Sequence, residues 1–327
     1  MSDRRSFLVR LGALLAAAGL PSAPGAVAPA RDRLGDLLPM RPLGRTGQEV
    51  TMLGVGGWHI GRMSERDAQA AIEGALEGGV RFFDTAESYQ DGRSETRLGR
   101  VLTPRYRDVV YLMTKTTATD AATAKRHLEE SLRRLKVDRL DLWQMHAVTS
   151  PDDVDGRLSA GVLDVILEAK ASGKVRHVGF TGHSQPAAHL RVLERTEAFE
   201  VCQMPINLAD PGYESFIEHV VPRAVGRGMG VLAMKTLANG GFFGGSQHGE
   251  HGDGPRVVPD RVRMADALGF VWSLPVSVLI TGADAPAQLE EKMALARSFT
   301  PLSEGDRAAL IARVAEVAGR RVEFYKS

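Results

Sequence analysis

The chain of 327 residues alternates short apolar runs with amphipathic helical patterns, and this alternation constrains its fold more than any other feature. Runs such as "VRFF" and "VVYLMT" are typical of short buried strands. Counting from the run that begins at Met52, eight predicted strands alternate with eight predicted helices. Eight strand–helix units over about 250 residues indicate a closed (β/α)8 barrel with parallel strands.

We therefore predict an α/β fold in which one (β/α)8 TIM barrel spans residues 40–327. Two strand-like runs around Arg45 predict a short N-terminal hairpin, and a C-terminal tail helix is expected near 304–323. The expected barrel strands lie near residues 52–55, 80–84, 109–114, 139–146, 175–182, 200–206, 230–236 and 277–282. The expected helices lie near residues 65–78, 94–102, 120–136, 160–172, 186–196, 214–228, 260–273 and 286–299.

The alternative architecture is an open, doubly wound sheet. Such a sheet normally carries a G-x-G-x-x-G turn after its first strand. The segment "LGVGGWHIG" does not supply one, because the sixth position counted from Gly54 is His59. Counting from Gly56 gives G-x-x-x-x-G, but Arg62 and Met63 then replace the Lys and Ser/Thr of a phosphate-binding loop. The barrel is therefore preferred.

Residues 1–30 have a charged head, an apolar middle and a tail of small residues, which is the layout of an export signal. The pair Arg4-Arg5, followed by "SFL", resembles a twin-arginine signal. The apolar middle is shorter than the roughly 20 residues of a membrane-spanning helix. We expect cleavage after Ala28 or Ala30, recognition by the twin-arginine export machinery, and a periplasmic or secreted mature chain without stable membrane insertion. The alternative is a basic amphipathic N-terminal arm.

Composition narrows the class of protein further. The apolar fraction of 43% and charged fraction of 25% are those of a soluble globular enzyme, and a net charge of +1 favours no nucleic-acid partner. The single cysteine, Cys202, excludes an intramolecular disulfide and a zinc site built on several thiolates. The glycine-rich segment 237–259 is expected to cover a site. We interpret its His248 and His251 as solvated loop residues and predict no metal.

Titratable side chains follow three consecutive predicted strands. Asp84 ends the second strand with Tyr89 in the loop beyond it, Lys115 ends the third, and His146 ends the fourth. Each residue alone could have a purely structural role, such as capping a turn or packing. The carboxyl ends of barrel strands meet at one mouth, however, where the chemistry of such folds is found. The sequence therefore predicts that these four side chains converge on one site.

These residue types together can move a proton. A tyrosine has a pKa near ~10, and a neighbouring ammonium lowers that pKa. A buried lysine keeps its charge only when a carboxylate holds it. We therefore expect Asp84 to hold Lys115, Lys115 to tune Tyr89, and His146 to orient a carbonyl oxygen. Because no amino-acid side chain donates a hydride, a cofactor must supply it.

At these residues the chain resembles the aldo-keto reductase superfamily. The segment "FFDTAESYQDGRSETRLG" is similar to the family signature D-T-A-x-x-Y-x-x-G-x-S-E-x-x-L-G, and Lys115 and "DLWQMH" match the lysine and histidine strands. The resemblance runs over about residues 40–300. It implies that Tyr89 is the general acid/base, that Asp84 and Lys115 tune it, and that His146 orients the substrate. It also implies an extended nicotinamide cofactor bound without a Rossmann fold.

The resemblance further implies a set of cofactor contacts, in which this chain departs from the family at several positions. His183 stands where the family usually has the Asn of a Ser-Asn pair. In the segment that resembles the family's adenosine-phosphate site, Gly282 stands in place of the usual lysine and Gln288 in place of the arginine that often binds the 2′-phosphate, while Lys292 remains to supply charge. The family as a whole nevertheless implies NADP as the cofactor, with NAD possible. Trp58 falls in the substrate-pocket region. The implied cofactor-binding residues are Thr181, His183, Gln203, Met234, Gly282, Gln288, Glu291 and Lys292.

The leading functional hypothesis is an NAD(P)-dependent oxidoreductase that reduces an aldehyde or ketone, or oxidises the matching alcohol, with Tyr89 as general acid/base. One alternative is an aldolase or lyase that uses Lys115 as a Schiff-base nucleophile. Another is a non-catalytic barrel that senses bound nicotinamide. Because free NADPH is not expected outside the cytoplasm, the export signal favours a cofactor that binds before export and stays bound.

Overall fold

The computed structural model describes residues 29–245, 256, 258 and 260–326. Residues 1–28 of the predicted export signal, and both His248 and His251, lie outside the described residues. Within the described residues, no helix is both long and apolar enough to cross a membrane.

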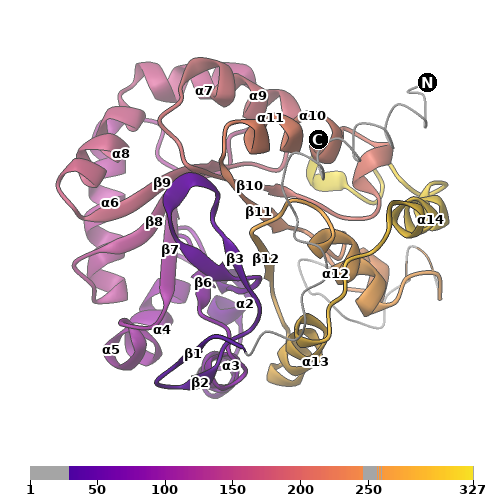
Figure 1. Ribbon diagram of the computed structural model, residues 1–327. Helices are drawn as coiled ribbons and strands as arrows, with labels where there is room; N and C mark the ends of the chain where they lie inside the picture. Colours follow the sequence, from indigo (N-terminus) through magenta and orange to yellow (C-terminus); the bar gives the residue numbers. More distant parts are fainter. Residues whose placement is uncertain (1–28, 246–255, 257, 259, 327) are drawn as a thin grey trace.

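Eight parallel strands form a closed barrel, as the sequence predicts (Figure 1). Neighbouring strands follow the order β10-β11-β12-β5-β6-β7-β8-β9, so chain order is kept around the barrel. The strands are β5 (Leu53–Gly56), β6 (Phe82–Asp84), β7 (Tyr111–Thr116), β8 (Leu140–Met145), β9 (Val175–Thr181), β10 (Val201–Pro205), β11 (Gly230–Met234) and β12 (Val278–Thr281).

Helices surround the barrel and confirm most of the expected ranges. The expected helices appear as α3 (Glu65–Glu77), α4 (Arg93–Val101), α6 (Ala121–Leu135), α8 (Val162–Ala171), α9 (Pro186–Arg195), α12 (Met264–Trp272) and α13 (Pro286–Arg297). Their starts follow local rules, since the side chains of Ser64 and Asp120 accept hydrogen bonds from the first-turn amides of α3 and α6. Three short helices were not expected: α2 (Gly57–Arg62), α5 (Thr103–Tyr106) and α7 (Pro151–Ser159).

Two expected helices differ from the structure. The helix expected over 214–228 is divided into α10 (Phe216–His219) and α11 (Val221–Gly226), because Pro222 has no N–H to continue the hydrogen-bond ladder. The tail helix expected over 304–323 ends earlier, as α14 (Glu304–Val314). Gly319, with a φ of 147°, breaks the helical path, and the chain ends in a short 3-10 turn, η4 (Phe324–Lys326).

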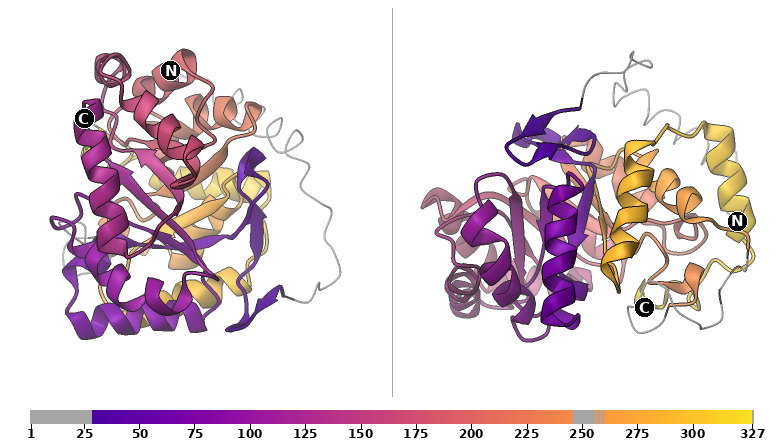
Figure 2. Two further views of the ribbon diagram at one scale, coloured as in Figure 1. Left: turned by 90° about the vertical axis from the view of Figure 1, so that its left-hand side faces the viewer. Right: turned by 90° about the horizontal axis from the view of Figure 1, so that it is seen from below.

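A hairpin closes one end of the barrel, where Figure 2 shows it in indigo. Its strands β3 (Met40–Pro42) and β4 (Glu49–Thr51) pair antiparallel, which confirms the predicted N-terminal hairpin. A second small pair, β1 (Arg31–Asp32) and β2 (Gly35–Asp36), precedes it. Leu43 and Val50 of the hairpin region pack with inward side chains of the strands into a buried apolar cluster. The opposite end of the barrel stays open for the site.

Candidate active site

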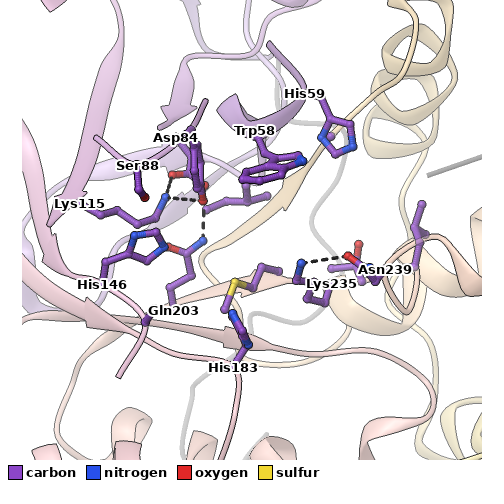
Figure 3. Close-up of a pocket in the computed structure, with 18 of the residues that line it drawn as sticks. Trp58, His59, Asp84, Ser88, Lys115, His146, His183, Gln203, Lys235 and Asn239 are labelled. Carbon is purple, nitrogen blue, oxygen red and sulfur yellow. Dashed lines mark hydrogen bonds and ion pairs between the residues drawn. The ribbon is translucent and has the colours of Figure 1, made fainter. Parts of the chain in front are cut away.

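The four predicted catalytic residues line one pocket at the open end of the barrel. Figure 3 shows three of them, Asp84, Lys115 and His146, which come from adjacent strands. Asp84 is the last residue of β6, Lys115 lies near the end of β7, and His146 directly follows β8. Tyr89 comes from the loop between β6 and α4. That loop turns sharply through Gly92, whose φ of 81° suits a residue without a Cβ. The structure thus brings together the residues that the sequence placed at separate strand ends.

Lys115 is the centre of this group. Its side chain is 1% exposed, and its ammonium donates to the Asp84 carboxylate. The same Nζ donates to the Thr85 carbonyl at 2.8 Å and lies 3.1 Å from the Tyr89 hydroxyl. The ammonium therefore joins the buried carboxylate to the phenol.

Burial and pairing shift the pKa values of this group. Burial raises the pKa of Asp84, although Lys115 opposes that shift. Burial alone would lower the pKa of Lys115, but the Asp84 carboxylate and Tyr89 outweigh it and raise the pKa overall. Burial also raises the pKa of Tyr89, while the Lys115 ammonium pulls it back down. Tyr89 is therefore a neutral phenol beside a cation that would stabilise its anion.

His146 offers a neutral imidazole to the same space. Burial, followed by the charge of Lys115, holds the pKa of His146 well below its usual value. Its ring centroid lies 5.8 Å from that of Tyr89, and Trp58 lies edge-on to Tyr89 at 5.4 Å. Within the part of the chain that the structure describes, the buried Nδ1 of His146 has no hydrogen-bond partner.

A pocket of about 380 Å³ opens over these residues. It contains the four predicted catalytic residues together with the predicted substrate residue Trp58. Among the predicted cofactor residues, those that line it are His183, Gln203, Met234 and Gly282. Half of the predicted cofactor set therefore shares the pocket with the four predicted catalytic residues.

The other four predicted cofactor residues do not line this pocket. Thr181 is buried in β9, and Glu291 is exposed on α13. The side-chain oxygen of Gln288 accepts a hydrogen bond from the Asp284 amide. Lys292 is fully buried and donates to the Thr281 hydroxyl at 2.9 Å and to a backbone carbonyl, that of Gly282, at 2.6 Å. Its ammonium thus holds the turn after β12 and is not brought to the pocket surface.

The pocket also contains residues that were not predicted, among them His59, Ser88, Thr117 and Asn239. His59 comes from α2, a helix that the sequence pattern did not reveal. Its imidazole lies against Gly282, where a Cβ would come within 1.9 Å of the ring. The glycine that replaces the family lysine therefore makes room for His59.

The residues present fit a nicotinamide carboxamide. Gln203 is 1% exposed, and its Nε2 lies 3.5 Å from Asp84 Oδ2. Its buried Oε1 has no hydrogen-bond partner among the described residues. A buried acceptor without a partner is costly, so an incoming N–H donor is favoured there.

No cluster of His, Cys, Asp or Glu suited to a metal ion occurs in the described ranges.

Comparison with known proteins agrees with this geometry. The model of the aldo/keto reductase family matches residues 52–291, so the chain belongs to that family and is an NAD(P)H-dependent oxidoreductase. The uncharacterized oxidoreductase YqkF of Bacillus subtilis (strain 168) is 25% identical over 289 residues, which cover 79% of this chain and 91% of YqkF.

Two solved structures show the same barrel. The holo form of aldo-keto reductase AKR11C1 from Bacillus halodurans aligns with a TM-score of 0.72 at 22% identity, over 84% of this chain and 96% of that chain. An aldo/keto reductase from Klebsiella pneumoniae, crystallised in complex with NADP and acetate, aligns with a TM-score of 0.64 at 24% identity. That alignment covers 83% of this chain and 94% of the Klebsiella chain.

Proposed function

We propose that the protein reduces an aldehyde or ketone with NADPH, or oxidises the matching alcohol, with Tyr89 as general acid/base. The observation that carries the proposal is the position of the Lys115 ammonium, which touches both the Asp84 carboxylate and the Tyr89 hydroxyl. A nicotinamide cofactor held at Gln203 would supply the hydride for this reaction. The protein then has to supply one proton to the carbonyl oxygen.

The chain's own residues divide that task. Tyr89 gives its phenolic proton to the substrate oxygen, and Lys115 stabilises the phenolate that remains. Asp84 keeps Lys115 charged in its buried position. His146, neutral and next to Tyr89, offers an N–H to the same carbonyl oxygen. In the oxidative direction, the same residues accept the proton from the alcohol.

NADP is the cofactor of choice in this proposal. The Klebsiella relative was crystallised with NADP, and the unpaired Oε1 of Gln203 suits the carboxamide that NADP shares with NAD. The residues that would choose between the two cofactors, Gln288 and Lys292, lie away from the pocket of the proton-transfer group. The preference for NADP therefore rests on the relative, and NAD is the alternative.

The charge state of Lys115 argues against the alternative function, a Schiff-base aldolase. A Schiff base needs a free amine, whereas the raised pKa of Lys115 keeps its ammonium protonated near neutrality.

One experiment tests the reductase and the aldolase hypotheses together. Purified protein is mixed with NADPH and a panel of aldehydes and ketones, and with borohydride in parallel. We expect saturable NADPH oxidation and no adduct. A trapped adduct on Lys115, or no NADPH binding by fluorescence titration, would overturn the proposal.

The proposal includes export. The pattern of Arg4, Arg5 and the apolar run that follows supports a twin-arginine route, which would deliver the folded chain to the periplasm or beyond. A tightly held cofactor would then travel inside the barrel. Cell fractionation tests this: the chain is expected outside the cytoplasm, and the double variant Arg4→Lys/Arg5→Lys inside it. Mass spectrometry of the native exported chain should show retained NADP, and a chain free of nicotinamide contradicts the carried-cofactor part.

A further inference from the structure

The last described residues of the chain lie at one side of the open end of the barrel, against residues that follow β9 and β10. We call Val322–Lys326 the C-terminal strap. It lies beside α10 in Figure 1, where it is drawn in yellow. Four of its five residues are buried, the exception being Phe324, which is 51% exposed. A terminal segment that is so deeply packed is held by specific contacts rather than by chain connectivity.

Lys326 anchors the strap. Its Nζ donates to Asp210 Oδ1 at 2.7 Å, to the Tyr213 carbonyl at 2.8 Å and to Glu323 Oε2 at 3.0 Å. Asp210 and Glu323 are both fully buried, so the ammonium is held by two carboxylates away from water. Removal of Lys326 would leave two buried carboxylates without their cation, so the packing of the strap depends on this residue.

Tyr325 ties the strap to the barrel itself. Its hydroxyl accepts a hydrogen bond from Asn207 Nδ2 at 2.9 Å and donates one to Glu323 Oε1 at 3.1 Å. Asn207 lies two residues beyond the end of β10, and its Nδ2 also lies 3.3 Å from the Lys235 carbonyl just beyond β11. Through Asn207, the strap is therefore connected to the ends of β10 and β11, two strands that border the pocket.

One contact of the strap reaches a residue of the pocket. The backbone carbonyl of Tyr325 lies 3.0 Å from Nδ1 of His183, a side chain that lines the pocket. A carbonyl can only accept a hydrogen bond, so Nδ1 must carry the proton. Burial lowers the pKa of His183, an effect that the Tyr325 carbonyl opposes and the Lys235 charge reinforces, and the ring is therefore neutral.

We infer that the C-terminal strap is a positioning element that fixes His183 as the Nδ1–H tautomer, so that its Nε2 presents a hydrogen-bond acceptor to the pocket. The structure gives this Nε2 no partner among the described residues. The group that binds there must therefore be a donor, an N–H or an O–H. Two sources have that chemistry: the carboxamide of the cofactor and a hydroxyl of the substrate.

The first of these sources suits the neighbourhood. A carboxamide has two N–H groups, and Gln203 Oε1, which is buried, is a second acceptor in the same pocket. The asparagine that the family usually has at this position could turn either its oxygen or its nitrogen toward a ligand. A strap-held histidine has no such choice. The strap therefore makes this part of the pocket selective for donors.

The tautomer can be measured without any turnover. Nitrogen-15 NMR of the imidazole distinguishes a protonated ring nitrogen from a bare one, and His183→Asn assigns the signal. In the full chain without cofactor we expect one species, the Nδ1–H tautomer. A chain truncated after Arg321 should populate both tautomers, whereas the control Arg321→Ala, at an exposed position just before the strap, should keep one. An Nε2–H tautomer in the full chain, or an unchanged tautomer after truncation, overturns the inference.

A binding experiment tests the acceptor and separates its two ligands; this part rests on the proposed function. The probes are NADP and its 3-acetylpyridine analogue, in which a methyl group replaces the carboxamide nitrogen. If the carboxamide is the donor, NADP binds about 3–10-fold more tightly than the analogue, and this ratio shrinks in His183→Ala and in the truncated chain.

If a substrate hydroxyl is the donor, His183→Ala raises the KM of a hydroxylated carbonyl substrate about 3–10-fold while NADP affinity is unchanged. A variant that changes neither quantity contradicts the acceptor role. Because the NMR measurement needs neither cofactor nor substrate, a failure of the proposed reductase function would leave the tautomer result intact, and the two failures are distinguishable.

Discussion

Replacement of Lys115 by methionine tests the buried ion pair that the site is built on. Methionine keeps much of the length and volume of the side chain but removes the ammonium. The variant loses the hydrogen bonds to Asp84, Thr85 and Tyr89 and leaves a carboxylate that is 3% exposed without its cation. Loss of one partner of a buried pair costs about 3–5 kcal/mol of folding free energy.

The loss of unfolding free energy caused by Lys115→Met depends on pH, because Asp84 can take up a proton once its cation is gone. Burial already raises the pKa of Asp84, and removal of Lys115 raises it further. A carboxyl whose folded pKa lies above its unfolded value contributes stability at low pH that is lost as pH rises through the folded pKa. Lys115→Met should therefore be much less destabilising near pH 5 than near pH 8.

Denaturant unfolding at the two pH values measures this difference, with the linear extrapolation giving each free energy. The matched control is Asp84→Asn/Lys115→Met, which has no buried charge left. It should recover most of the loss at pH 8 and show little dependence on pH. Equal destabilisation of Lys115→Met at both pH values, or a double variant no more stable than the single one, would refute the electrostatic account.

Two further predictions follow from packing and titration. Gly99 of α4 faces α6 so closely that a Cβ would lie 1.9 Å from the Arg134 carbonyl, whereas Gly74 of α3 has open space. In thermal or denaturant unfolding, Gly99→Ala should cost about 1–3 kcal/mol and Gly74→Ala should gain roughly 0.5–1 kcal/mol; the same sign for both would contradict the packing. Burial lowers the pKa of His189 to about 4. Unfolding free energy should therefore drop by roughly 3 kcal/mol between pH 6.5 and pH 4 through this residue, and His189→Gln should lack that component.

The sequence predicts the barrel well, and it predicts that four polar side chains meet at its mouth, because both depend on local patterns. Each apolar run marks a strand, and the parallel arrangement brings the ends of successive strands to one mouth. Asp84, Lys115 and His146 are predictable for this reason. Tyr89 is predictable because the long signature around it fixes the loop.

The remainder of the site depends on contacts that no local pattern records. Lys292 occupies a family phosphate position in the sequence, yet its ammonium is buried against backbone carbonyl and hydroxyl oxygens of the turn after β12. His59 enters the pocket from a helix of six residues that has little periodicity of its own. Gly282 departs from the family pattern, and only the structure explains this departure, because the His59 ring occupies the space that a side chain at this position would need.

The end of the chain shows the same limit most clearly. The periodicity of residues 304–323 favours one long helix, and nothing in that pattern marks Glu323, or Lys326 beyond it, as buried. In the structure Glu323 and Lys326 are fully or almost fully buried, because the Lys326 ammonium pairs with the carboxylates of both Glu323 and Asp210. A charged residue is buried only where a partner distant in sequence compensates it, and sequence spacing does not reveal that partner.

The central claim is that the Tyr89 hydroxyl delivers the proton beside Lys115, and the variant Tyr89→Phe tests it most directly. Single-turnover reduction of a carbonyl substrate should slow by about 10²–10⁴-fold, the usual contribution of a positioned general acid. NADPH binding, followed by fluorescence titration, should remain within about twofold of the unaltered chain, because the phenyl ring still fills its place against Trp58. A Tyr89→Phe enzyme that turns over at a near-normal rate with NADPH bound would contradict the account.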